Sequence, residues 1–344
     1  MRKFIILSLI LCIVSCTEKK KEKHPFNTVK IELVFEDSVS IRAIEFLDAN
    51  TLAFAGSKGI YGTVDIPTGK VRSNIMKYHT FIPEFRAVAH TSTDFFMLSV
   101  ANPALLYKTG DNGKMDLVYM EEGEGVFYDA MKFWNDNEGI AIGDTVDGCL
   151  SIIVTRDGGN TWNKILCDSL PAGIAGEGAF AASNTNIEIK GDAAWIATTS
   201  GRIYFSDNRG VTWNTMQTPI INDKETQGIY SINFYDESIG YGIGGDFTEA
   251  EANKANKIIT RDGGNIWGTI ADGISPGYKS CVQFIPNSGG EDLIAIGFTG
   301  IDYSNDGGSS WNLLSEEGFY TLRFLNDSVA YAAGKNRIAK LVFE

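Results

Sequence analysis

The chain has 344 residues, of which 44% are hydrophobic and 11% aromatic, and it contains 37 glycines. This composition excludes a largely disordered chain and is typical of a turn-rich β protein with an aromatic core. The 30 basic and 43 acidic residues give a net charge of −13 at pH 7, which argues against non-specific binding of nucleic acid.

The first residues predict an export signal that ends in a lipid-attachment site. Arg2 and Lys3 precede eleven apolar residues that end at Val14, a stretch too short to cross a bilayer as a helix. The run Ile-Val-Ser-Cys that ends at Cys16 resembles a bacterial lipobox, which implies cleavage before Cys16 and acylation of that residue. Residues 1–16 are therefore expected to be a lipoprotein signal peptide. An ordinary signal peptide with an incidental cysteine is the alternative.

Residues 17–27 are polar and charged, and we expect a flexible tether between the lipid and a folded body at residues 28–344. Thr17 is not the aspartate that often retains bacterial lipoproteins at the inner membrane. The sequence therefore favours attachment to the bacterial outer membrane with the body in the periplasm, and display on the cell surface is the alternative. Removal of residues 1–16 leaves 28 basic against 43 acidic residues, a net charge of −15.

The pattern Ser/Thr-x-Asp/Asn-x-Gly-x-x-Trp occurs four times, at residues 155–162, 206–213, 260–267 and 304–311. We call these the octapeptide turns. The acid or amide binds nearby backbone amides, glycine accepts a positive φ, and tryptophan packs beside the next strand. The pattern resembles the Asp-box, or BNR repeat, of the sialidase-like propeller superfamily. The resemblance implies a β-propeller fold and says little directly about function.

Seven segments of the chain share one pattern of strands. Each begins with an alternating apolar strand, followed by a short turn, a strand rich in glycine and alanine, and a strand that leads into a further turn. They begin near Ser40, Glu84, Val126, Gly178, Gly228, Gly277 and Gly318. Successive starts are 41 to 52 residues apart, the range of four-stranded propeller blades. The turns at residues 63–69 and 109–113 are weakened copies that lack the tryptophan.

The two ends of the chain are expected to share the seventh blade. Residues 319–343 supply three strands, and residues 28–35 form one more strand before the first segment. Their pairing would close the ring and hide its sheet edges. The predicted fold class is therefore all-β: a seven-bladed β-propeller of four-stranded antiparallel blades, the last closed by the N-terminal strand. A six-bladed ring, as in sialidases, is the alternative.

Two further runs, residues 133–144 and 234–246, resemble the repeat of photosystem II stability and assembly factor-like proteins. Each begins with two aromatic residues and ends in Gly-Asp or Gly-Gly-Asp. The resemblance covers essentially residues 28–344, and the family includes many exported bacterial proteins. It implies a propeller that serves as an assembly or interaction platform, and it does not by itself imply a role in a photosystem.

Three cysteines remain in the mature chain. Cys149 and Cys167 flank the first octapeptide turn symmetrically, which places them opposite one another on a hairpin. An exported protein can form a disulfide there, and two buried thiols are the alternative. Cys281 lies in a strand pattern and is expected in the core.

The candidate site follows from an alignment of the first strands of the blades, which line the channel of a propeller. The blades are aligned on Phe46, His90, Phe133, Asn184, Phe234, Phe284 and Phe324. Four residues earlier stand Arg42, Arg86, Asp129, Phe180, Tyr230, Ser280 and Tyr320. With nearby loops, the residues expected to converge on the mouth opposite the octapeptide turns are Arg42, Arg86, His79, Asp129, Asp144, Glu177, Tyr230 and Asp246.

These residues support two interpretations. Arg42 and Arg86 could clamp the carboxylate or phosphate of an anionic ligand, or they could pair with Asp129 and Glu177 to balance charges around a wet channel. Sialidase-like hydrolysis of an anionic glycan would need an arginine triad, a tyrosine nucleophile with its glutamate, and an acid/base aspartate. Two arginines and Tyr230 are available, but a third arginine and the Arg-Ile-Pro signature are absent from the expected positions.

The sequence contains no pattern that is typical of a metal site or a cofactor site. The chain has three histidines, no His or Cys spacing that is typical of zinc or haem, and no glycine-rich run that opens a helix after a strand. We therefore predict a lipid-anchored, non-enzymatic and monomeric envelope platform that binds an envelope protein or an anionic ligand and no nucleic acid. A sialidase-like glycoside hydrolase is the alternative function.

Overall fold

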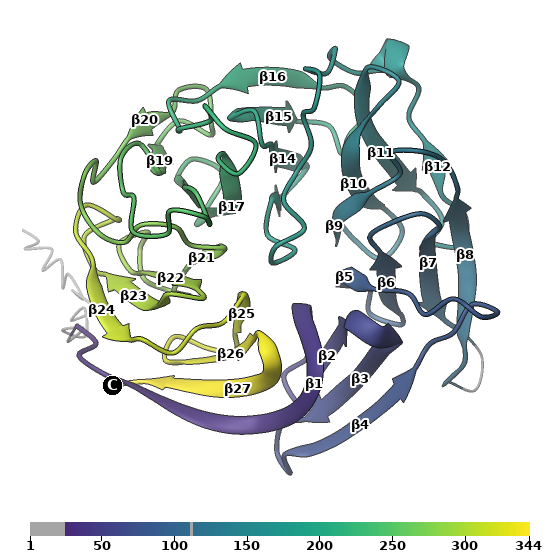
Figure 1. Ribbon diagram of the computed structural model, residues 1–344, viewed down its shortest axis with the longest axis horizontal. Helices are drawn as coiled ribbons and strands as arrows, with labels where there is room; N and C mark the ends of the chain where they lie inside the picture. Colours follow the sequence, from purple (N-terminus) through teal and green to yellow (C-terminus); the bar gives the residue numbers. More distant parts are fainter. Residues whose placement is uncertain (1–24, 111–112) are drawn as a thin grey trace, which may run out of the picture.

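The computed structural model describes residues 25–110 and 113–344. The signal peptide, Cys16 and most of the expected tether lie outside the described residues. Antiparallel sheets surround a central axis as the blades of a ring (Figure 1). Within the two described ranges, no helix is long and apolar enough to cross a membrane. The short 3₁₀ turns are η1 (Ser57–Gly59) and η3 (Cys167–Ser169).

Five blades are separate four-stranded sheets. Blade 2 contains β5 (Phe85–His90), β6 (Phe95–Ser99), β7 (Ala104–Thr109) and β8 (Met115–Glu121). Blade 3 contains β9 (Tyr128–Phe133), β10 (Gly139–Val146), β11 (Cys149–Thr155) and β12 (Asn163–Lys164). Blade 4 contains β13 (Ile187–Lys190), β14 (Ala193–Ala197), β15 (Arg202–Ser206) and β16 (Asn214–Gln217). Blade 5 contains β17 (Ile229–Phe234), β18 (Gly240–Gly244), β19 (Lys257–Thr260) and β20 (Gly268–Thr269), and blade 6 contains β21 (Cys281–Phe284), β22 (Leu293–Gly297), β23 (Gly300–Ser304) and β24 (Asn312–Ser315).

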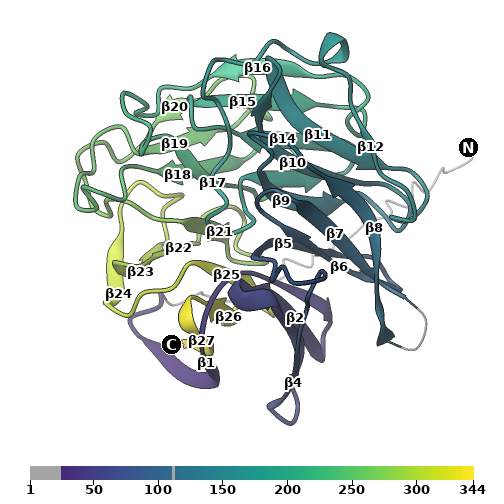
Figure 2. The same cartoon turned by 45° about the vertical axis from the view of Figure 1, so that its right-hand side comes forward.

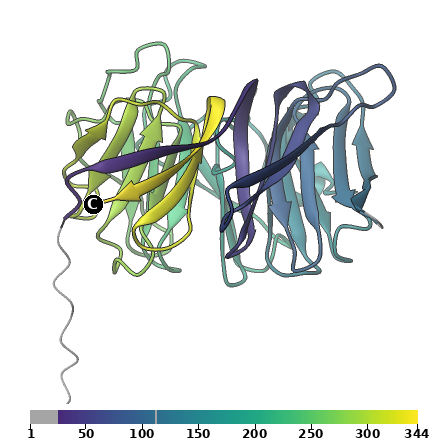
Figure 3. The same ribbon diagram turned by 90° about the horizontal axis from the view of Figure 1, so that it is seen from below.

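The remaining strands form one seven-stranded sheet that contains two blades. Its order is β25 (Thr321–Phe324), β26 (Val329–Ala333), β27 (Lys335–Phe343), β1 (Val29–Asp48), β2 (Thr51–Gly56), β3 (Ile60–Asp65) and β4 (Lys70–Ile75). The first half of β1 pairs with β27, from Val29 opposite Phe343 to Glu36 opposite Arg337. The second half pairs with β2 as the innermost strand of blade 1. The predicted seven blades, with the last closed by the N-terminal strand, are confirmed (Figure 3).

The direction of the strands divides the turns between two faces of the ring. In every blade the first strand is innermost, so the turns after the first and third strands share one face, the octapeptide face. The connections between blades and the turns after the second strands lie on the opposite face. Contacts confirm this division, because Arg156 of an octapeptide turn pairs with Glu138 of the β9–β10 turn at 3.0 Å. Figure 2 shows blades 2 and 3 side by side in this arrangement.

The four octapeptide turns have the same hydrogen bonds. In the first, the Gly159 amide donates to Thr155 Oγ1 and the Thr161 amide donates to Asp157 Oδ1, both at 2.9 Å. The equivalent pairs, also at 2.9 Å, are Gly210 to Ser206 and Thr212 to Asn208, Gly264 to Thr260 and Ile266 to Asp262, and Gly308 to Ser304 and Ser310 to Asp306. The aspartates of these turns therefore hold the backbone.

A substitution at Gly159 can test how tightly an octapeptide turn packs against the preceding blade. Its φ is +77°, and a Cβ there would lie 2.2 Å from Cε1 of Phe96 in blade 2. We expect Gly159→Ala to lower the free energy of unfolding by about 2 to 4 kcal/mol, because it adds overpacking to backbone strain. Gly69→Ala is the matched control, since Gly69 has φ +68° and open space around it. Equal losses in urea unfolding of the two variants would contradict the packing argument.

Cys149 and Cys167 are joined by a disulfide across the end of blade 3, with a Cα–Cα distance of 5.5 Å. Cys281, the free cysteine among the described residues, is buried in blade 6. The apolar core consists of clusters in which residues of adjacent blades meet, such as Ile140 of β10 with Ile196 of β14. The stability of the ring therefore depends on the seams between blades as well as on the sheets.

Candidate functional site

A buried segment, residues 177–186, closes the channel on the opposite face, and we call it the plug. It precedes β13 and reaches into the middle of the ring (Figure 1). All of it except Phe180 is buried. Ser183 donates through Oγ to the carbonyl of Ser280 at 2.6 Å, and Thr321 Oγ1 donates to the carbonyl of Ser183 at 2.9 Å. The plug therefore contacts blades 6 and 7, across the channel from its own blade.

The plug also contacts blades 1 to 3. Asn184 donates through Nδ2 to the carbonyl of Val88 at 2.7 Å and accepts the Met131 amide at 3.0 Å. Arg42 Nη1 donates to the carbonyl of Ala182 at 3.3 Å. One short segment thus holds backbone groups of blades 2, 3 and 6 and side chains of blades 1 and 7. The mouth at which the sequence placed its candidate site is closed around this segment.

The structure corrects the proposed pairing of the two candidate arginines. Arg42 lies over the ring of Tyr320, 4.0 Å from its centroid, and burial together with nearby Arg86 lowers the pKa of Arg42. Arg86 pairs with Glu84 at 2.7 Å. Neither arginine pairs with Glu177, because Glu177 is turned toward blade 4.

Glu177 belongs to a buried network of blade 4. Its carboxylate pairs with Arg202 and accepts the Thr198 hydroxyl at 2.8 Å and the Tyr204 hydroxyl at 3.1 Å. Burial opposes ionisation of Glu177, but these hydrogen bonds, led by that from Arg202, hold its pKa below the usual range. Glu177 thus anchors the start of the plug and is not available to a ligand in the channel.

Buried Asp129 and half-buried Asp144 form a carboxyl pair beside the plug. Asp129 is fully buried, and neither of its carboxyl oxygens reaches hydrogen-bond geometry with the Ala179 and Ala181 amides that face it. Burial and the charge of Asp144 raise the pKa of Asp129 well above its usual range, although Arg86 opposes this. Burial raises the pKa of Asp144 to about 6, and its Oδ1 accepts the Ala179 amide at 3.2 Å.

The other candidate residues are separated from this pair. His79 is exposed on the connection between β4 and β5, where it contacts the Tyr78 ring. The Tyr230 hydroxyl donates to the carbonyl of Thr226 at 2.8 Å. Burial opposes ionisation of Asp246, but hydrogen bonds from Thr248 and from other neighbours lower its pKa, so it caps its own loop. The structure thus brings together Arg86, Asp129 and Asp144.

The alignment of blade 4 in the sequence analysis was wrong by five residues. Asn184 lies in the plug, and the residue that occupies the aligned position is Ile189. Glu188, the residue before Ile189, shows the correct alignment, because its carboxylate accepts Lys132 Nζ and Asn233 Nδ2 of the neighbouring blades, each at 2.9 Å. Blade 4 therefore begins after an extra segment whose small and polar residues resemble a strand start.

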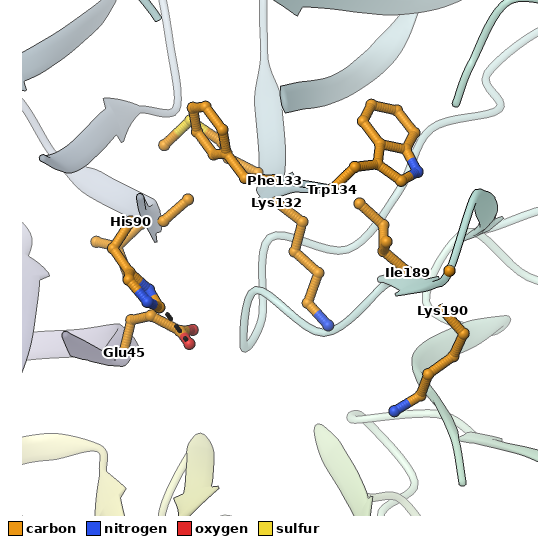
Figure 4. Close-up of a pocket in the computed structure, with 11 residues that line it drawn as sticks. Glu45, His90, Lys132, Phe133, Trp134, Ile189 and Lys190 are labelled. Atoms are coloured by element: carbon orange, nitrogen blue, oxygen red, sulfur yellow. Dashed lines mark ion pairs between the residues drawn. The ribbon is translucent and has the colours of Figure 1, made fainter. Parts of the chain in front are cut away.

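An open, charged depression lies at the other mouth, on the octapeptide face. Two cavities of about 350 and 620 Å³ meet there and share Glu45 and Lys190. We call this site the funnel and define it by the polar residues that line the cavities: Glu45, His90, Lys132, Lys190, Asn233, Gln283, Asn287 and Arg323. Figure 4 shows the Lys132 and Lys190 side chains extended into this space, with Glu45 and His90 on the other side.

Glu45 in the funnel and Glu188 beneath its lysines are held by fixed partners. Glu45 accepts Arg323 Nε at 3.2 Å, and His90 Nδ1 lies 3.8 Å from it. Burial opposes ionisation of Glu188, but the charges of Lys132 and Lys190 hold its pKa below the usual range. Lys190 Nζ is 3.9 Å from Glu188 and its side chain is 34% exposed, so it has the loosest partner of the funnel cations.

A signal for the funnel was present in the sequence. Most of its residues stand immediately before the aligned residue of their blade, as Glu45, Lys132, Asn233, Gln283 and Arg323 do. Because side chains alternate along a strand, a residue one position before a packed aromatic faces the channel. The candidate residues taken from the sequence stand four positions earlier, and that position lies at the closed mouth.

The comparisons with known proteins support the fold. The structure is similar to YCF48 bound to D1 peptide, with a TM-score of 0.64 and 12% identity over 94% of this chain and 96% of that one. It is also similar to YCF48 from Cyanidioschyzon merolae, with a TM-score of 0.63 and 15% identity over 92% and 98% of the two chains. The WD40 repeats of RRP9 give a TM-score of 0.64 and 10% identity over 94% and 99%.

These likenesses establish a β-propeller that resembles YCF48 and WD40 propellers. No protein-family model and no curated protein matches the sequence. Among residues 25–110 and 113–344, no group of three or more His, Cys, Asp or Glu side chains could hold a metal ion. The funnel presents ammonium, guanidinium, imidazole and amide groups, which suit binding of a polar or anionic ligand.

Proposed function

We propose that this protein is a non-enzymatic binding platform of the bacterial envelope. Its body is tethered to the outer membrane through a lipid on Cys16, lies in the periplasm, and binds an acidic segment of another envelope protein in the funnel. The observation that carries the proposal is the open funnel, where Lys132 and Lys190 extend into a depression shared by two cavities.

The charge distribution supports an acidic ligand. The expected mature chain carries a net charge of −15, which would repel acidic segments from most of the surface. In the funnel, two ammonium groups lie near one another, and the carboxylates that balance them are held by Asn233 and Arg323 as well. An incoming carboxylate can therefore approach Lys190 while Glu188 keeps its other partners.

The comparisons make a peptide ligand reasonable. One of the similar structures is YCF48 with a bound D1 peptide, so the same fold holds a peptide in that protein. The proposal for this chain names a class, an acidic protein segment, and it rests on the residues of the funnel. No photosystem partner is part of it.

The alternative of a glycoside hydrolase has no support from the opposite mouth. Arg42 is buried against Tyr320, and the Tyr230 hydroxyl donates to a backbone carbonyl. A tyrosine nucleophile needs a neighbouring base that accepts its proton, and the hydroxyl of Tyr230 is directed to Thr226 instead. The plug occupies the space beside these groups.

Lys190→Glu tests the proposed ligand class. We expect it to weaken binding of a fluorescent peptide rich in Asp and Glu by at least tenfold at low salt, because an attractive charge becomes a repulsive one. Fluorescence anisotropy measures the affinity, and the same peptide with Asn and Gln is the neutral reference. Lys335→Glu is the matched control, since Lys335 is exposed on β27 away from the funnel. Equal affinity of the acidic and neutral peptides for the wild type would contradict the proposal.

A further inference from the structure

Six of the seven seams between blades hold an aromatic side chain that comes from an octapeptide turn or from the N-terminal part of the chain. Trp162, Trp213, Trp267 and Trp311 of the octapeptide turns are buried at the seams with the preceding blades. Trp162, for example, lies 6.4 Å from the ring of Phe96 in blade 2. Phe26 packs on Tyr303 at the seam between blades 6 and 7, and Phe46 packs on Tyr331 between blades 7 and 1.

The seam between blades 1 and 2 receives no tryptophan from an octapeptide turn, and the aromatic side chains of its buried core, Phe85, Phe95 and Tyr107, belong to the strands of blade 2. Asp116 stands where the octapeptide turn would place its tryptophan. The strand position that carries Phe96, Trp195 or Tyr241 in other blades, opposite the residue before the aligned one, is Ala53 in blade 1. Two residues of this turn lie outside the described ranges, and both are polar in the sequence.

A cavity of about 290 Å³ occupies this seam. Its apolar walls are Leu47, Tyr61, Phe95 and Met115, and Thr63, Arg72 and Asn74 stand at its polar rim. An enclosed apolar cavity of about 150 Å³ is large enough to bind benzene. The seam can therefore accommodate an indole or phenyl ring, with hydrogen-bonding groups at the rim for the backbone or the indole N–H.

We propose that this seam is a second binding site, which takes an aromatic side chain of a partner protein presented on an extended segment. We infer an aromatic occupant because four equivalent seams each hold a tryptophan from a neighbouring turn. The guest side chain would occupy the space that Trp162 fills one blade further along.

Exposed apolar residues on blade 2 indicate a protein segment instead of a free small molecule. Leu117 and Met120 of β8 are 39% and 43% exposed. They pair with Tyr107 and Leu105, which face blade 1, so they extend the apolar surface from the seam along the outermost strand of blade 2. An extended segment anchored by one aromatic side chain would cover them.

The site is independent of the funnel, so it does not rest on the proposed function. The test uses the full folded body with two probes: 5-fluoroindole, followed by ¹⁹F NMR, and the peptide Ser-Gly-Ser-Trp-Ser-Gly-Ser, compared with its Trp-to-Ala version. Thr63→Trp and Asn74→Trp each place an indole at the rim and should occlude the cavity. Two variants are used because one of them can fail to fold.

We expect either occluding variant to weaken binding of both probes by at least tenfold. Thr215→Trp, on half-buried Thr215 of blade 4, is the matched control and should bind the probes as the wild type does. Lys190→Glu should also leave this binding unchanged, which separates this site from the funnel. Unchanged affinity in a folded occluding variant would overturn the proposal. So would absence of binding to the wild type, or binding of 5-fluoroindole without Trp-dependent binding of the peptide.

Discussion

Removal of the first half of β1 is expected to unfold the whole ring and not a single blade. A chain that begins at Asp37 lacks the strand that pairs with β27 from Val29 to Glu36. The loss exposes the edge of blade 7 and separates Phe26 and Phe35 from Tyr303 and Phe54. We expect the free energy of unfolding to fall by at least about 5 kcal/mol, which is most of the stability of an ordinary domain.

Thermal unfolding followed by circular dichroism measures this effect. The control is a chain that begins at residue 25, which keeps Phe26 and the complete β1 strand. It should unfold at the temperature of the longer protein. A chain beginning at Asp37 with an unchanged midpoint would show that blade 7 does not close the ring.

Because of the Asp129–Asp144 pair, we expect the free energy of unfolding to fall as the pH rises from 5 to 7.5. The folded-state pKa values of Asp129 and Asp144 are raised, that of Asp144 to about 6. A carboxyl group with a raised folded-state pKa stabilises the fold fully below its unfolded pKa and loses that contribution as pH rises through the folded value. Both groups therefore favour the fold at pH 5 and disfavour it at pH 7.5.

Asp129→Asn should remove much of this dependence. The amide stays neutral at all pH values, its oxygen can accept the amides of Ala179 or Ala181, and its nitrogen can donate to Asp144. We expect a gain of about 1 to 3 kcal/mol in the free energy of unfolding at pH 7.5, and a smaller change at pH 5. Urea unfolding at the two pH values provides the measurement.

Asp246→Asn is the control, and we expect it to change the free energy of unfolding in the opposite direction. The pKa of Asp246 is lowered, so its ionised form stabilises the fold throughout this pH range, and its loss should destabilise the protein at both values. If Asp129→Asn destabilises the protein equally at pH 5 and pH 7.5, then Asp129 is ionised in the folded state and the account of the pair is wrong.

The fold could be predicted because its signals are local. Each octapeptide turn needs an acceptor, a glycine and a tryptophan within eight residues, and Asp157, Gly159 and Trp162 have those roles in the structure. The seven repeated strand patterns predicted the number of blades, and each pattern is specified by neighbours in the sequence. Closure joins distant residues, but the unpaired apolar strand at residues 28–35 and the three strands at the C-terminal end indicated it.

The site could not be predicted in the same way because its contacts are between distant residues. Arg323 and Glu45 meet across 278 positions, and Asn184 holds Val88 across 96. The plug has no repeat pattern, and its register depends on contacts with blades that are distant in the sequence, such as those with the carbonyls of Val88 and Ser280. The pattern of the first strands therefore indicated polar residues but pointed to the mouth that the plug closes.

The most direct test of the platform is photo-crosslinking in cells, with benzoylphenylalanine in place of Asn287 in the full lipid-anchored chain. Asn287 is exposed and lines the funnel, whereas His79 is exposed on the opposite face and serves as the reference position. The account predicts an adduct with an envelope protein from position 287, none from position 79, and loss of the adduct when Lys190→Glu is added. Adducts from position 79 alone, or an adduct from position 287 that Lys190→Glu leaves unchanged, would contradict it.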